Sequence, residues 1–323
     1  MQTIVGVLRG GPSHEHDISL QSGATILANL PGERFSARDI YIDKQGVWHD
    51  RGRPVAPDRV LRQIDVALLP LHGEFGEQGE VQRLLAQFGV PYCGPDAYGA
   101  HLARHKVIAK AKAHEAGFRT PTSVYIERVE DAEQQTHDII RTLHQPVMVK
   151  PVGWGSSAGV SLVGGYALVL AAIEQLFADG AEGVLVEDRI RGREATVGVV
   201  EELRGERLYA LPTIEIIPPP EAEFFTAHAK YNGETREICP GNFSRVETEE
   251  LQHMAKVMHR ALEQRHFSRS DFIVTPKGIY FLETNSAPAV GLTDESLLPR
   301  SLAAVGISLS EFFSHLVNLA QSR

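Results

Sequence analysis

Acidic and amide side chains with a spacing suited to divalent-cation binding lie between residues 269 and 285. The sequence reads Arg269-Ser-Asp271-Phe-Ile-Val, then Thr-Pro-Lys-Gly, then Ile-Tyr-Phe-Leu-Glu283-Thr-Asn285. If the two halves pair as a hairpin, Asp271 lies opposite Glu283 and Arg269 opposite Asn285 on one face. Facing carboxylates repel each other unless a divalent cation lies between them, with Asn285 as a further oxygen ligand. The alternative is an exposed hairpin face on which Arg269 neutralises Asp271.

The loop of this hairpin sets the pairing. Thr-Pro-Lys-Gly suits a type I turn with Gly278 in the left-handed region, which predicts a three-residue loop. Thr275 then lies opposite Ile279, and the two carboxylates share a face. A four-residue loop would place them on opposite faces.

A glycine-rich loop follows the predicted strand Pro-Val-Met-Val-Lys. Alternation along this strand places Met148 and Lys150 on one face, and Val147 and Val149 on the other. Lys150 therefore lies beside a Gly-x-Gly-Ser-Ser turn, whose N–H groups and hydroxyls suit a phosphate. The loop is not of the Walker type, because the lysine precedes the glycines. The alternative is a flexible hairpin with a solvated lysine.

Polar residues also follow two predicted strands near the N-terminus. After the first strand, a glycine-rich turn leads into a helix that we expect to begin near Ser19, with Ser19 as its cap. Glu15 in this turn and His72, which follows the strand Asp-Val-Ala-Leu-Leu-Pro-Leu, are expected at one sheet edge, where open α/β folds bind ligands. We interpret His14 and His16 as solvated loop residues rather than metal ligands.

A long segment beginning at Pro218 has little periodicity. Loops of about twenty residues inside compact domains are usually lids or disordered. Phe224, Phe225, Lys230 and Tyr231 near its centre favour a lid.

Composition limits the class of protein. The chain has 323 residues, 43% of them hydrophobic and 23% charged, which predicts two or three folded sub-domains. A net charge of −9 argues against a general nucleic-acid or anionic-membrane binder. Cys93 and Cys239 form no C-x-x-C motif, so we expect neither a disulfide framework nor a zinc site, and a cytoplasmic protein. The uncharged stretch 152–173 is interpreted as a turn and a helix, not a membrane span.

Strand and helix patterns alternate over residues 1–94, which predicts an α/β fold with an open parallel sheet. Asp96 is expected to cap an alanine-rich helix that Gly117 closes. Later helices are expected over residues 166–177, 249–265 and 310–320. We expect three domains, with boundaries near Gly94 and Glu187: a Rossmann-like N-terminal domain over residues 1–94, a central subdomain over residues 95–186 and a C-terminal subdomain over residues 187–323.

Together these motifs resemble those of the D-alanine–D-alanine ligases, a family of the ATP-grasp superfamily. The resemblance runs from Gly10 to Pro299, and its pieces occur in the family's order: GGPSHEHDISLQSG, LHGEFGEQGEVQ, PYCG, VKPVGWGSSAGVS, EDRIRGREATVGVV, LPTIEI, AKY, CP, SRSDF and FLETNSAP. It implies that the N-terminal sheet domain precedes a two-part ATP-grasp fold of α+β character. The central subdomain would carry the phosphate hairpin, and the C-terminal subdomain the lid and the metal site.

The resemblance also implies an ATP site and a metal site. The nucleotide contacts would be Lys106, Lys150 and Ser157 for the phosphates, Glu187 and Ile190 for the adenine, and Glu194 for the ribose. Two magnesium ions, or manganese, would be bound by Asp271, Glu283 and Asn285.

Substrate roles follow from the same resemblance. Glu15 would bind the ammonium of the first D-alanine, within a hydrogen-bonded set completed by Ser156 and Tyr231. Lys230 would bind the transferred phosphate, and His72 would lie near the carboxylate of the first D-alanine. Arg269 would stabilise the tetrahedral intermediate, and the amide of Ala289 or Gly291 would donate to its oxyanion. Ser296 and Leu297 would bind the carboxylate of the second D-alanine.

The activity so implied is ATP-dependent joining of two D-alanines through an acyl phosphate, for peptidoglycan precursor synthesis, by a cytoplasmic homodimer. One alternative joins D-alanine to D-lactate or another D-amino acid, and another is a nucleotide-binding protein that has lost catalysis. Three features depart from the family pattern: Trp154 in the phosphate hairpin, His228 before Ala-Lys-Tyr, and a loop over residues 288–293 about two residues longer than usual.

Overall fold

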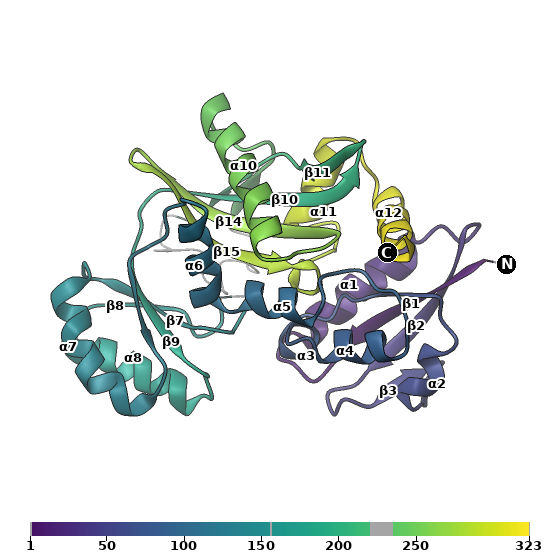
Figure 1. Ribbon diagram of the computed structural model, residues 1–323, viewed down its shortest axis with the longest axis horizontal. Coiled ribbons are helices and arrows are strands. Elements are labelled where there is room, and N and C mark those ends of the chain that lie inside the picture. The colour runs from purple at the N-terminus through teal and green to yellow at the C-terminus, as the bar shows by residue number, and fades with distance from the viewer. Residues whose placement is uncertain (1, 156, 220–234, 323) are drawn as a thin grey trace.

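The computed structural model describes residues 2–155, 157–219 and 235–322. Within these residues the chain folds around three sheets that follow one another along the sequence. Figure 1 shows the N-terminal sheet on the right, the central sheet on the left and the C-terminal sheet between them. The first sheet has parallel strands at its centre and the other two are antiparallel, so the α/β fold class expected from the sequence is confirmed.

The N-terminal sheet has the strand order β4-β3-β2-β1-β5, and β1 pairs in parallel with both β2 and β5. The crossover from β1 to β2 is made by α1, as in an open parallel sheet. The patterns described above do not predict β2, β3 or β4. The elements are β1 (Thr3–Gly10), α1 (His16–Asn29), β2 (Phe35–Ile42), β3 (Trp48–Asp50), β4 (Arg53–Pro54), α2 (Pro57–Leu61), β5 (Val66–Leu68), α3 (Glu74–Glu77) and α4 (Glu80–Gln87).

The expected start of α1 at Ser19 is wrong. Glu15 is the N-cap residue, so Ser19 lies inside the helix. Its hydroxyl accepts a hydrogen bond from the Gly10 amide at 2.8 Å and donates one to the Pro70 carbonyl at 2.5 Å. Ser19 therefore ties the helix to the sheet instead of capping it.

His16 is also not a solvated loop residue. Its side chain is buried, and Nδ1 lies 2.7 Å from the Gly11 carbonyl oxygen. His14, by contrast, is exposed as expected. The turn after β1 is thus packed from within by one of its two histidines.

The central sheet is antiparallel with the order β6-β9-β7-β8. Val147 and Val149 pack into the core with Val169 and Ile173 of α8. Met148 and Lys150 lie on the other face, as the alternation predicts. The elements are β6 (Ser123–Ile126), a 3₁₀ turn η1 (Val129–Asp131), α7 (Ala132–Thr142), β7 (Val147–Pro151), β8 (Ser161–Val163), α8 (Tyr166–Ala178) and β9 (Val184–Asp188).

The C-terminal sheet has the order β13-β12-β10-β14-β15, with β11 paired to β10. Its elements are β10 (Arg193–Leu203), β11 (Glu206–Ala210), β12 (Ile214–Ile217), β13 (Arg236–Ile238), α10 (Arg245–Ala261), β14 (Phe267–Thr275), β15 (Gly278–Ser286), η2 (Ala287–Ala289), α11 (Leu297–Ala304) and α12 (Leu309–Gln321). Helix α10 covers one face through a core that includes Met254, Met258, Phe272 and Phe281.

The predicted hairpin loop is wrong, although the predicted carboxylate pairing is right. Thr275 lies opposite Gly278, so the loop has two residues rather than three. A β-bulge between Asp271 and Phe272 then shifts the register by one residue, which restores Asp271 opposite Glu283. The wrong loop length and the unpredicted bulge each shift the pairing by one residue in opposite directions. Because the bulge lies between the turn and the carboxylates, the two shifts cancel at Asp271 and Glu283.

The alanine-rich helix is broken in two. Asp96 caps α5 (Ala97–Arg104) as expected, by accepting from two backbone amides. His105 then has an extended conformation, with φ −81° and ψ 96°, and α6 (Lys106–Glu115) begins after it. Lys106 is thereby placed at a helix start. Both helices pack against β15 of the C-terminal sheet.

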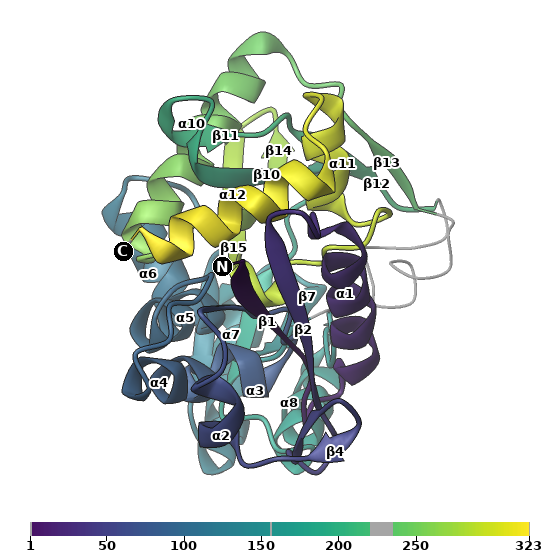
Figure 2. The ribbon, with the colours of Figure 1, turned by 90° about the vertical axis from the view of Figure 1, so that its right-hand side faces the viewer.

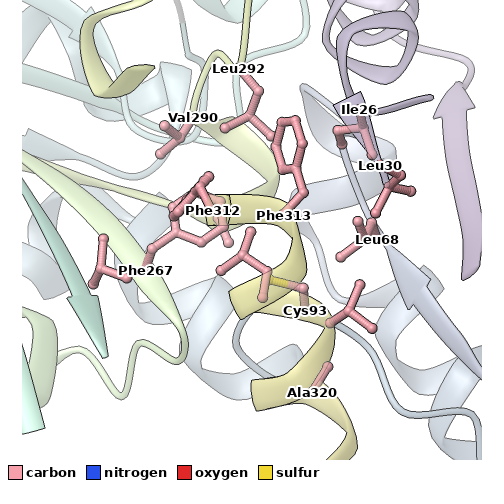
Figure 3. Close-up of a cluster of buried hydrophobic side chains, with 14 of the residues drawn as sticks. Ile26, Leu30, Leu68, Cys93, Phe267, Val290, Leu292, Phe312, Phe313 and Ala320 are labelled. Atoms are coloured by element: carbon pink, nitrogen blue, oxygen red, sulfur yellow. The ribbon is translucent and has the colours of Figure 1, made fainter. Parts of the chain in front are cut away.

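A buried apolar cluster joins the N-terminal sheet to the C-terminal one. It includes Val7 of β1, Ile26 of α1, Phe267 of β14 and Phe312 and Phe313 of α12. Figure 2 shows α12 lying between α1 and the C-terminal sheet, and Figure 3 shows its side chains meeting those of α1. The last helix of the chain therefore packs on the first sheet.

The division into three domains at residues 94 and 186 stays a prediction. Its second boundary falls inside β9, where Glu187 pairs with strands β6 and β7 of the central sheet. Among the described residues, no single helix is long and apolar enough to cross a membrane, and α11 and α12 reach that length only together, across a bend of 104°.

Candidate active site

A cavity of about 520 Å³ lies between the central and C-terminal sheets. It brings the predicted phosphate loop and the predicted metal hairpin together. The sequence-predicted residues that line it are Lys106, Lys150, Ser157, Glu187, Ile190, Glu194, Arg269, Asp271, Glu283 and Leu297. The lining does not include five other predicted residues, which are Glu15, His72, Asn285, Gly291 and Ser296. Outside the described residues lie Ser156, Lys230, Tyr231, His228 and the centre of the predicted lid.

Glu187 forms a buried ion cluster with two lysines at this cavity. One oxygen lies 2.8 Å from Lys110 Nζ, and the other contacts Lys150 Nζ. Burial alone would raise the pKa of Glu187, but Lys150 and Lys110 lower it below its ordinary value. Lys110 is not among the residues predicted from the sequence. It could have been found from its spacing of one helical turn from Lys106, which places both lysines on one face of α6.

Asp271 is held by hydrogen bonds from three side chains. It accepts two from Arg269, both at 3.1 Å, one from Asn285 Nδ2 at 2.8 Å and one from Thr196 Oγ1 at 2.5 Å. The Arg269–Asp271 pair matches the neutralisation considered as an alternative, but it lines the cavity with side chains only 15% and 21% exposed. Burial alone would lower the pKa of Arg269, but Asp271 raises it, so the guanidinium remains charged.

Glu283 is the more accessible carboxylate of the hairpin, with its side chain 33% exposed. Lys106 Nζ lies 3.5 Å from its Oε2 and donates to the Trp154 carbonyl at 2.7 Å, which links the metal hairpin to the phosphate loop. In the described segments of the chain, no three His, Cys, Asp or Glu side chains gather as a metal site. A cation here would therefore need the amide oxygen of Asn285 or oxygens of a ligand.

Glu15 lies between two glycine-containing loops. A β-carbon added to Gly155 of the phosphate loop would lie 3.5 Å from Glu15 Oε2, and one added to Gly73 would lie 3.2 Å from the same atom. Further along the phosphate loop, Ser157 has φ 58°, in the left-handed region that side-chain-bearing residues rarely adopt. The loop that approaches Glu15 is thus held in a strained conformation at the cavity.

His72 and Glu77 are buried titratable groups near Glu15 and Arg269. Burial lowers the pKa of His72 to about 4, and the Arg269 charge acts in the same direction, so the ring is neutral at pH 7. Its Nε2 lies 3.0 Å from Ser22 Oγ. Burial raises the pKa of Glu77 to about 7, and repulsion from Glu15 adds to this. Glu77 is not among the predicted site residues, although it lies in the motif that begins with His72.

The region predicted to receive the second substrate leads into α11. Ser296 is its N-cap residue, but the hydroxyl accepts from the Thr293 amide at 3.2 Å and makes no capping hydrogen bond to the helix. The first N–H groups of α11, beginning at Leu297, are therefore suited to an anion. A β-carbon on Gly291 would lie 2.7 Å from Ser296 Oγ, so any larger residue here would displace the Ser296 hydroxyl.

Two protein-family models match this chain. The family model described as D-ala D-ala ligase C-terminus matches residues 113–318, and that described as D-ala D-ala ligase N-terminus matches residues 4–60. The chain belongs to the D-alanine–D-alanine ligase family. The D-alanine–D-alanine ligase of Syntrophobacter fumaroxidans is 37% identical over 98% of this chain and 97% of its own length. That of Citrifermentans bemidjiense is 35% identical over 98% and 95%.

Solved structures of D-alanine–D-alanine ligases and a related ligase have the same fold. The D-Ala:D-Ser ligase VanG of Enterococcus faecalis has a TM-score of 0.86 at 27% identity, covering 99% of this chain and 100% of that one. The D-alanine–D-alanine ligase of Bacillus anthracis complexed with ATP has a TM-score of 0.80 at 27% identity, covering 100% and 98%. The described residues therefore have the fold expected for this family, in which an N-terminal sheet domain precedes the ATP-grasp fold.

Proposed function

We propose that this protein joins two D-alanine molecules into D-alanyl-D-alanine at the expense of ATP, for peptidoglycan precursor synthesis. The observation that carries the proposal is one cavity lined by Lys150, Asp271 and Glu283, in a chain of the D-alanine–D-alanine ligase family. The two relatives at 37% and 35% identity are both named D-alanine–D-alanine ligase, which favours D-alanine over D-lactate or another D-amino acid. The complete charged set at the cavity favours an enzyme over a binding protein without catalysis.

ATP binds in this cavity with its phosphates toward Lys106 and Lys150. The ammonium of Lys150 can leave Glu187 for a phosphate because Lys110 continues to compensate the Glu187 carboxylate. Backbone N–H groups of the loop at Ser157 would add hydrogen bonds to the phosphates. The remaining nucleotide contacts proposed are Glu187 and Ile190 for the adenine and Glu194 for the ribose.

Two magnesium ions, or manganese, fit the oxygen donors of Asp271, Glu283 and Asn285. Asn285 holds Asp271 through its amide nitrogen, which leaves its carbonyl oxygen as an acceptor. Carboxylate and amide oxygens are the ligands that magnesium prefers. When bound, the ions supply compensation for the charge of the triphosphate.

The two D-alanines are proposed to bind in neighbouring subsites near Arg269. Glu15 accepts from the ammonium of the first, and His72 faces its carboxylate. The carboxylate of the second is held at the start of α11 by Ser296 and Leu297, with Gly291 or Ala289 as oxyanion donor. The residues proposed to complete the first subsite from outside the described chain are Ser156, Lys230 and Tyr231.

The chemistry proceeds in two steps. A carboxylate oxygen of the first D-alanine takes the γ-phosphoryl group, which gives an acyl phosphate and ADP. The amine of the second D-alanine then attacks the acyl carbon and loses a proton, and inorganic phosphate leaves with the carboxylate oxygen. Arg269, held in place by Asp271, provides a fixed positive charge where negative charge develops on the tetrahedral intermediate.

Assembly and location complete the proposal. The protein is proposed to act as a homodimer in the cytoplasm, and light scattering would then give twice the 35.5 kDa of the chain. Cys93 and Cys239 are both unpaired, which suits a reducing compartment.

The activity is tested with purified protein, ATP, magnesium and a panel of D-alanine, D-serine, D-lactate and L-alanine. Phosphate release and ligated product are measured together. We expect equal amounts of phosphate and D-alanyl-D-alanine with D-alanine alone. Absence of both would overturn the proposal, and a product only when D-lactate or D-serine is added would overturn the choice of second substrate.

A further inference from the structure

Ser22 connects the two proposed substrate subsites through hydrogen bonds. It lies on α1 and is completely buried. Its Oγ lies 3.0 Å from His72 Nε2 of the first subsite and 3.4 Å from the Leu292 amide nitrogen of the second-substrate loop. The proposed function assigns no role to this hydroxyl.

The donors and acceptors at Ser22 determine which nitrogen of His72 carries the proton. The Leu292 N–H can only donate, so Ser22 Oγ accepts from it. A buried hydroxyl hydrogen needs an acceptor, and among the described residues the acceptor at Ser22 is His72 Nε2. Nε2 must then be unprotonated, and a neutral ring carries its proton on Nδ1.

Nδ1 is the ring nitrogen of His72 that Ser22 does not contact. Within the described residues Nδ1 has no hydrogen-bond partner. It is also not among the buried side-chain atoms of the described residues that lack a hydrogen-bond partner. Nδ1 of His72 therefore remains accessible and can donate to a ligand oxygen.

Packing keeps Ser22 in this position. One turn further along α1, Ile26 lies in the same buried cluster as Leu292 and Phe313 (Figure 3). The Ser22 hydroxyl is therefore kept away from solvent, between His72 and the loop at Leu292.

We propose that Ser22 is a positioning residue that holds His72 in the Nδ1–H tautomer, so that this N–H donates to a carboxylate or acyl-phosphate oxygen of the first substrate. The identity of that substrate rests on the proposed function, whereas the tautomer does not. The hydrogen bond between Ser22 and the Leu292 amide connects Ser22, and through it His72, to the loop of the second subsite.

Nitrogen-15 spectroscopy of the histidine rings in the full-length protein tests the tautomer, with the His72 signals assigned by their loss in His72→Asn. At pH 7 we expect a pyrrole-type Nδ1 and a pyridine-type Nε2. In Ser22→Ala the Nε2 signal should shift, or the Nε2–H tautomer should appear. A pyrrole-type Nε2 in the unsubstituted protein, or two pyrrole-type nitrogens, would overturn the proposal.

Kinetics of the same variants test the consequence. Loss of one positioned donor should lower kcat/KM for D-alanine about tenfold in Ser22→Ala, with the KM for ATP unchanged. Ser22→Thr, which keeps a hydroxyl, should recover most of the rate. The control is Ser314→Ala, which removes a buried hydroxyl that donates to the Ser310 carbonyl within α12.

Equal losses in Ser22→Ala and Ser314→Ala, or no recovery in a folded Ser22→Thr, would show a merely structural role and overturn the proposal. If the protein forms no dipeptide while His72 has the expected tautomer, the proposed function fails and the role of Ser22 in fixing the ring stands. The spectrum of the unsubstituted protein decides the tautomer even if Ser22→Ala does not fold.

Discussion

Asp271 and Glu283 lie opposite each other on one face of the C-terminal sheet because a β-bulge separates them from the hairpin turn. Without the bulge, Leu282 would lie opposite Asp271, and Glu283 would lie opposite Ser270 on the face that packs against α10. Asp271 is compensated by Arg269, and Glu283 lies near Lys106. The bulge thus places two oxygen donors of different accessibility at the cavity.

The accessible carboxylate should be essential. Glu283→Gln removes a charged oxygen ligand, and we expect kcat/KM to fall at least about a hundredfold, with a higher magnesium concentration needed for half-maximal rate. Steady-state assays over a magnesium titration check this. Glu249→Gln, at an exposed position of α10, is the control and should behave like the unsubstituted enzyme. A Glu283→Gln enzyme with an unchanged magnesium dependence would contradict the assignment.

Lys110 should matter for ATP although it does not line the cavity. In Lys110→Met, Lys150 is the remaining described cation that contacts Glu187. Because Lys150 is then less able to leave Glu187 for a phosphate, we expect a higher KM for ATP. We also expect the free energy of unfolding to fall by about 2 kcal/mol. Denaturant titration and ATP kinetics measure the two effects. Glu187→Gln added to Lys110→Met should recover some of the stability, because the uncompensated charge is removed. Lys112→Met, which loses only an exposed pair with Glu115, should change neither, and an unaltered KM in Lys110→Met would contradict the prediction.

Glu77 should make stability depend on pH. Its pKa is about 7 in the fold against an ordinary 4.5, so the folded state binds the proton more tightly than the unfolded chain. The stabilisation is complete below pH 4.5 and is lost as the pH rises through 7. Glu77→Gln stays neutral, and its stability relative to the unsubstituted protein should therefore grow by about 3 kcal/mol between about pH 4.5 and 8. Urea titrations across this range measure the difference, and a constant difference would rule the shift out.

Gly291 should resist substitution for steric reasons. In Gly291→Ala the new β-carbon would lie 2.7 Å from Ser296 Oγ and 3.2 Å from its Cβ, so the Ser296 hydroxyl must turn away from Thr293 or the start of α11 must move. We expect about 1–3 kcal/mol of destabilisation and a higher KM for the second D-alanine. Gly32→Ala is the matched control, because nothing lies within 4 Å of its β-carbon position. A normal second KM in Gly291→Ala would place the second subsite elsewhere.

The sequence predicts the faces of the strands better than the connections between them. Alternation correctly places Lys150 on the cavity face of β7 and Val149 in the core. The bulge at Asp271 cannot be recognised in the sequence in the same way, because its extra residue, Leu282, is apolar like many strand residues. The pairing of the two carboxylates was therefore predicted correctly from an incorrect loop.

Contacts between distant segments were the least predictable feature of the site. Lys110 of α6 and Glu187 of β9 are 77 residues apart in the sequence, and only the tertiary fold brings their side chains together. The break at His105 that places Lys106 at a helix start has no glycine or proline beside it, and the one glycine of the alanine-rich stretch, Gly99, lies inside α5. The sequence could supply the residue types, whereas their pairing depends on three sheets coming together.

Transfer of oxygen from D-alanine to phosphate tests the central claim most directly. With D-alanine labelled with oxygen-18 in its carboxyl group, ATP and magnesium, the acyl-phosphate route leaves one labelled oxygen in the phosphate for each dipeptide formed. Mass spectrometry of the released phosphate should show this ratio. Dipeptide formed together with unlabelled phosphate, or phosphate released without dipeptide, would contradict the account.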